Sequence, residues 1–63
     1  MALHDYIVVY NLSINGCWIL DQMTVSAFDE QEAIDLVRSI IHHRMHRVII
    51  NPEAYRKEIY LDE

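Results

Sequence analysis

The chain has very little of the three residue types that most often constrain small domains. It contains one cysteine, one glycine and one proline among 63 residues. Because Cys17 is alone, an internal disulfide and a four-cysteine zinc site are both excluded. Gly16 alone cannot build a glycine-rich loop that cradles phosphate groups. We therefore expect a domain held together by its core, in the reducing cytoplasm where unpaired thiols are usual.

Long apolar runs and basic charge are also scarce. The longest apolar runs, Tyr6 to Tyr10 and Cys17 to Leu20, fall far short of the roughly 20 residues of a membrane span. No basic segment precedes an apolar run, as it would in a signal peptide. The formal net charge is −5, and no lysine or arginine appears before Arg38. We expect a single domain over residues 1–63, without membrane association, whose acidity disfavours general nucleic-acid binding.

A β-hairpin is the clearest local prediction. Asn15-Gly16 is a typical two-residue turn, and the flanking segments, Tyr6 to Ile14 and Cys17 to Phe28, are rich in strand-forming residues. A two-residue loop sets the register and so assigns every side chain to a face. One face then carries the apolar residues Tyr6, Val8, Leu12, Ile19, Met23 and Val25. The other face carries Ile7, Val9, Trp18 and Leu20.

A helix is predicted from about Asp29 to Met45. Asp29 and Glu32 have the spacing of a capping box, and the apolar stripe recurs at helical spacing through Ala33, Ile34, Val37, Ile40, Ile41 and Met45. After the helix we expect a short strand over residues 47–50, a turn at 51–54 and a final strand at about 56–61, with a helix over 52–61 as the alternative. The fold class is then α+β, in the order ββαββ: a small, antiparallel-rich sheet with one helix packed on one face.

One helix can cover only one face of such a sheet. The face with Ile7, Val9, Trp18 and Leu20 is left apolar and uncovered, which usually marks an interface; tryptophan is moreover favoured at binding hot spots. The alternative is that the C-terminal segment folds back over this face as a second helix. The interface would serve a homodimer or another protein.

Four acidic residues form a second candidate binding group: Asp29, Glu30, Glu32 and Asp35. Acids are expected at the start of a helix for capping and dipole reasons, but together they could also occupy a basic groove on a partner. The basic residues Arg44, Arg47, Arg56 and Lys57, with Tyr55 and Tyr60 nearby, suggest an alternative function, a small dimeric regulator that contacts nucleic acid.

Catalytic and metal-binding groups are not expected. His42 and His46 share a helix face and could chelate a metal, but no third ligand has a recognisable spacing. Cys17 is predicted to be a buried apolar residue rather than a nucleophile. Because no nucleophile, base and orienting group can be assembled, we expect neither an enzyme nor a cofactor.

The pattern resembles small phage-encoded proteins of the anti-CRISPR and anti-defence type. A short strand pair leads through Val25-x-Ala27-x-Asp29-Glu30 into one helix and then short strands. The resemblance covers the whole chain and lies in size, acidity and element order. It implies a stoichiometric inhibitor, without chemistry, that binds a host protein assembly. The sequence thus predicts a non-enzymatic protein-binding module that acts as an inhibitor or regulator.

Overall fold

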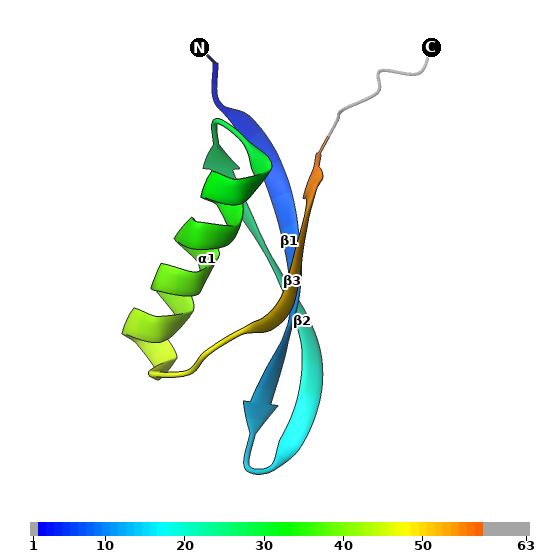
Figure 1. The fold of residues 1–63 in the computed structure, drawn as a ribbon, viewed down its shortest axis with the longest axis vertical. Coiled ribbons are helices and arrows are strands. Elements are labelled where there is room, and N and C mark those ends of the chain that lie inside the picture. The colour runs from blue at the N-terminus through cyan, green and yellow to red at the C-terminus, as the bar shows by residue number, and fades with distance from the viewer. Residues whose placement is uncertain (1, 58–63) are drawn as a thin grey trace.

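The structure, a computed structural model of the chain, describes residues 2–57. Two strands, β1 (His4–Ile14) and β2 (Cys17–Ala27), are followed by the helix α1 (Glu30–Met45) and the strand β3 (Ile50–Arg56). β1 lies between the other two in an antiparallel sheet of order β2-β1-β3. The helix packs on one side of the sheet (Figure 1). The predicted α+β class, with one helix on one face, is confirmed.

The hairpin has the predicted turn and register. Asn15 and Gly16 have φ angles of 52° and 80°, and positive values at both central residues are what a type I′ turn requires. Ile14 lies opposite Cys17, and the pairing continues without interruption to His4 opposite Ala27. The assignment of side chains to the two faces in the hairpin is therefore as the sequence indicates.

The helix begins with the predicted capping box. The Glu32 N–H donates to Asp29 Oδ1 at 2.8 Å, and Glu32 Oε1 accepts from the Phe28 N–H at 2.7 Å. Both bonds satisfy backbone donors that the first turn leaves without a helical partner. The helix ends at Met45, and the next residue, His46, caps it in the left-handed region with φ 54°. The predicted start and end of the helix are confirmed to within one residue.

The core lies between α1 and the central strand. Its buried side chains are Tyr6, Val8, Tyr10, Leu12, Ala27, Ala33, Val37, Ile41 and Ile49. Alternate residues of β1 point at the helix, and every fourth residue of α1 from Ala33 points back. Met45, predicted in the stripe, is exposed. Each step of four residues drifts by about 40° around a helix with 3.6 residues per turn, so by Met45 the stripe has turned away from the sheet.

β3 corrects the prediction for the C-terminal third. The predicted short strand over residues 47–50 and the turn at 51–54 are wrong, since one strand runs from Ile50 to Arg56. Asn51 has φ 53°, and the register with β1 shifts between Val9 and Asn11. This irregularity accommodates the proline that follows, and an edge strand tolerates a missing N–H. The predicted strand at about 56–61 extends beyond the described residues after Lys57.

The helix is shorter than the hairpin it covers. Sixteen helical residues span about 24 Å, whereas eleven strand residues span about 36 Å. The end of the hairpin therefore extends past the last turn of α1 (Figure 1). Side chains on the helix-facing side of this projecting end have no helix above them.

We predict that Asp29→Ala lowers the free energy of unfolding by about 1 kcal/mol, because the Glu32 N–H loses its acceptor. Denaturant unfolding followed by circular dichroism measures the change. Asp35→Ala is the control: this exposed carboxylate makes only surface contacts, a hydrogen bond from Gln31 at 3.1 Å and an ion pair with Arg38 at 3.6 Å. Its removal should cost less than about 0.5 kcal/mol. Equal effects of the two variants would contradict the capping role.

Candidate protein-binding surface

The sheet face opposite α1, called the open face, carries a cluster of apolar side chains from all three strands. Its members, called the open-face patch, are Ile7, Val9, Trp18, Leu20, Ile50 and Tyr55. The residues on central β1 are half-buried between their neighbours, whereas Trp18, Leu20 and Tyr55 are 59%, 70% and 54% exposed. Within residues 2–57, no helix or strand lies over this face. The predicted apolar face is thus present in the structure and uncovered by any described element.

A hollow of about 290 Å³ lies within the open-face patch. Its lining comes from Trp18 on β2, Asn11 on β1, and Ile50 and Asn51 on β3. The irregular pairing at Asn51 brings Ile50 opposite Asn11, as bulges beside binding sites often re-aim a side chain. Pockets for drug-sized ligands run to about 300–1,000 Å³. This hollow is at the lower limit of that range and suits one large side chain of a partner.

Two residues of the patch, Ile50 and Tyr55, were missed by the sequence reasoning. Their own segment was predicted as two short strands with a turn between, which left no register with β1. The alternation of Tyr55 with its neighbours was a usable signal for a strand. What was lacking was the strand's partner, because a pairing between residues 39 to 50 positions apart in the chain has no local signature.

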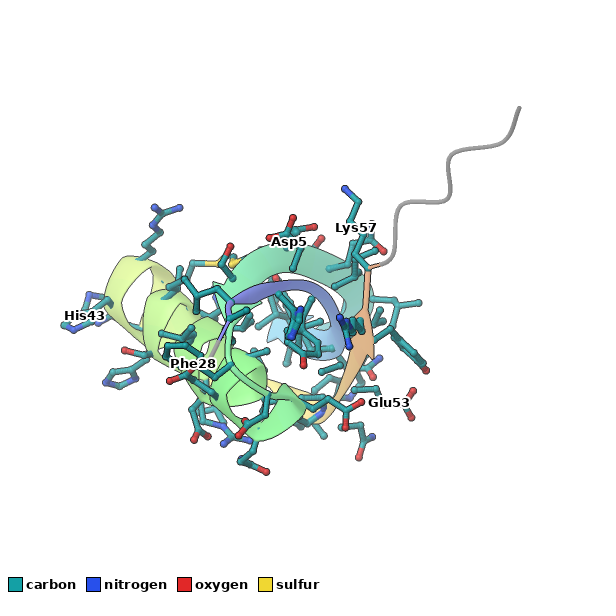
Figure 2. All side chains as sticks on the ribbon, turned by 90° about the horizontal axis from the view of Figure 1, so that it is seen from above. Asp5, Phe28, His43, Glu53 and Lys57 are labelled. Carbon is teal, nitrogen blue, oxygen red and sulfur yellow. The ribbon has the colours of Figure 1, made fainter. Side chains whose placement is uncertain are left out.

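Tyr55 and Glu53 form a hydrogen-bonded pair at the β3 side of the open face. Figure 2 shows Glu53 projecting from β3 on the side away from the helix. The Tyr55 hydroxyl donates to the Glu53 carboxylate. This hydrogen bond, helped by the nearby negative charge, raises the pKa of Tyr55 above its usual value of 10.0, because both favour the neutral phenol. The open face therefore offers a neutral aromatic side chain held beside an acid.

The predicted acidic group belongs to the helix layer and is not joined to the open face. Asp29 and Glu32 accept the two capping hydrogen bonds. Asp35 accepts from Gln31 at 3.1 Å and pairs with Arg38. Three of the four acids thus have local structural roles, and Glu30 lies beside them in the first turn.

The basic residues are divided between two ends of the molecule. Arg44 and Arg47 lie at the C-terminal end of α1, and Arg56 and Lys57 lie at the far end of β3. The seven-residue strand β3 separates the two pairs. Arg47 Nη1 also donates to the Ser13 carbonyl oxygen at 2.6 Å, which ties that side chain to the hairpin. The structure does not bring these side chains together into a single basic surface.

The histidines and the cysteine form no catalytic or metal arrangement in the described part of the chain. The ring centroid of His42 is 6.4 Å from that of His46 and 6.4 Å from that of His43. Among residues 2–57, no three metal-ligating side chains are grouped closely enough to hold an ion. The prediction that Cys17 is buried is wrong: it is exposed, because it lies at the projecting end of the hairpin beyond the reach of α1.

Comparisons with protein-family models, curated proteins and solved structures find no significant match to this chain. Within residues 2–57, the single helix falls short of the length and apolarity needed to cross a membrane.

We predict that Glu53→Gln lowers the pKa of Tyr55 toward 10, because the variant removes the negative charge that disfavours the phenolate. A pH titration followed by NMR of the Tyr55 ring measures it. Tyr10 is the internal reference: burial, and then Asp21 opposite it, raise its pKa, and the substitution leaves that environment unchanged. An unaltered Tyr55 titration would show that Glu53 is not its partner in solution.

Proposed function

We propose that this protein is a non-enzymatic protein-binding module whose open-face patch contacts a larger partner, acting as a stoichiometric inhibitor or regulator. The observation that supports the proposal most directly is the set of exposed apolar side chains, Trp18, Leu20 and Tyr55, on a face without a covering element in residues 2–57. An antiparallel sheet that leaves one face to water normally makes that face polar. An apolar face on so small a domain is typical of an interaction surface.

The open face combines apolar and polar side chains, as protein interfaces do. Trp18, Leu20 and Ile50 gather toward the hairpin end, whereas the exposed polar side chains of Gln22, Thr24 and Glu53 lie beside Val9 and Ile7 farther along the strands. Interfaces combine an apolar core with surrounding polar groups, and aromatic residues carry much of the binding energy. Trp18 is the anchor in this proposal, and the hollow beside it receives a side chain of the partner.

The partner is a protein with a basic rim, and binding takes place in the cytoplasm. A net charge of −5 attracts basic surfaces and accelerates association with them. The division of Arg44 and Arg47 from Arg56 and Lys57 counts against nucleic acid, which asks for a continuous basic path. The exposed free thiol of Cys17 suits a reducing compartment. Inhibition of a host assembly by a phage-encoded protein fits the size and acidity noted above.

We expect Trp18→Glu to weaken partner binding by about 30-fold or more, the effect of removing a hot-spot residue. Wild type and variant serve as matched baits for capture from a lysate of the host, and the captured protein is then titrated into each. Trp18 is the only tryptophan, so its fluorescence in wild type reports directly whether the partner covers it.

The matched control is Val48→Glu, which adds the same charge at an exposed apolar residue between α1 and β3, outside the open-face patch. It should bind like wild type. If Trp18→Glu binds as tightly as Val48→Glu while both remain folded by circular dichroism, the open face is not the binding surface.

A further inference from the structure

The outer edge of β2 has peptide groups that β1 does not use. A two-residue loop makes its flanking residues, Ile14 and Cys17, a hydrogen-bonded pair, and such pairs then alternate along the hairpin. The Lys57 N–H donates to the Asp5 carbonyl oxygen at 2.7 Å, which confirms that the odd-numbered residues of β1 bond toward β3. The even-numbered residues of β2, from Trp18 to Ser26, therefore direct their N–H and C=O groups outward.

The two edges of the sheet differ in how well they are protected. β3 carries the positive φ of Asn51, then Pro52 and Glu53, and it ends in Arg56. Such irregularities, prolines and charges are the features that keep edge strands from pairing with another chain. β2 is longer, at eleven residues, with no proline or glycine and one charged residue, Asp21. Within residues 2–57, the β2 edge is thus an open template for a further strand.

The charge of this edge favours a second copy of the same chain. Two identical surfaces that meet about a twofold axis carry the same net charge, so a self-interface is favoured where that net charge is small. The chain as a whole carries a net charge of −5, yet Asp21 is the only charge in Cys17–Ala27. A basic partner would find little to attract it along this edge.

The exposed side chains of the hairpin end and those of the neighbouring helix flank are also complementary between two copies. On the projecting hairpin end, Cys17 and Ile19 face the helix side but lie exposed. On α1, the flank bearing Arg38 borders a hollow of about 380 Å³ with Val48 of the segment that leads into β3, so the other flank is directed toward β2. That flank carries Leu36, which is 39% exposed. In an antiparallel pairing centred near Gln22, the middle of β2, Leu20 of each copy lies opposite Thr24 of the other. The hairpin end of each copy then lies beside the helix flank of the other.

We infer that two copies of this chain pair through their β2 strands, antiparallel and about a twofold axis, to form one continuous six-stranded sheet. The Ile19 of each copy is then covered from the Leu36 flank of its partner, which compensates for the short helix. The two open-face patches become neighbours on one side of the joined sheet. This pairing goes beyond the proposed function and does not depend on which protein the open face binds.

Asp21 makes the pairing reversible. Its Oδ1 accepts the Gln22 N–H at 2.8 Å, so one of the outward donors is already occupied, and the two Asp21 carboxylates lie near each other across the axis. Like charges on paired strands oppose the pairing. Asp21→Asn keeps the acceptor and removes the charge, so it should tighten the dimer.

Hydrogen exchange of the full chain, followed by NMR at low and high protein concentration, tests the pairing directly. The amides of Leu20 and Thr24 should become protected as concentration rises, together with a doubling of mass in sedimentation. The amides of Ile19 and Met23, which bond to β1, should be protected at both concentrations. A mass that remains that of a monomer, or a dimer in which Leu20 and Thr24 exchange freely, would overturn the inference.

Thr24→Pro is the decisive variant. The Thr24 N–H points away from β1, so a proline at this position removes a donor for the second copy and leaves the hairpin intact. It should raise the dimer dissociation constant about tenfold or more. Leu20→Lys, at a side chain already 70% exposed, should do the same without backbone change. Tyr55→Lys, on the same face but the opposite edge, should leave the dimer unchanged. If Tyr55→Lys dissociates the dimer and Leu20→Lys does not, the copies meet elsewhere and the β2 pairing is wrong.

Discussion

The rest of the structure depends on the two-residue turn at Asn15 and Gly16. With both residues at positive φ, the turn sets a register that runs unbroken through eleven pairs of β1 and β2. A slip by one residue would move every side chain of one strand to the other face. Val8 and Tyr10 would then leave the helix, and Ile7 and Val9 would replace them. The core and the open-face patch therefore have a common origin in one local constraint.

The second constraint is that the described chain has one helix for a sheet that is longer and has two sides. α1 buries one stripe, through Ala33, Val37 and Ile41, against alternate residues of β1. It leaves the opposite face and the hairpin end uncovered. Both proposals arise from this shortage: the open face suits another protein, and the β2 edge with the hairpin end suits a second copy. A domain of this length has a small core. Apolar area buried at either contact would therefore add to the stability that the core provides.

Much of the fold could be predicted because its signals are local. The hairpin register follows from Asn15-Gly16, and the helix bounds follow from the capping box at Asp29 and Glu32. β3 could not be predicted in the same way. From the local sequence, Asn51-Pro52 predicts the end of a strand. The strand continues there because β3 pairs with β1 as an edge strand, where a bulge and a proline are tolerated.

The candidate surface shows the same division. Ile7, Val9, Trp18 and Leu20 were assigned to one face from the hairpin pattern, since alternation and a turn are enough. The addition of Ile50 and Tyr55, and the hollow beside Trp18, required the pairing of β3 with β1. The exposure of Cys17 required the length of α1 relative to the hairpin. The sequence by itself determined which residues share a strand face and where the helix begins. Only the tertiary structure decided which of those residues are covered, because burial depends on what packs above a residue and not on its neighbours in the chain.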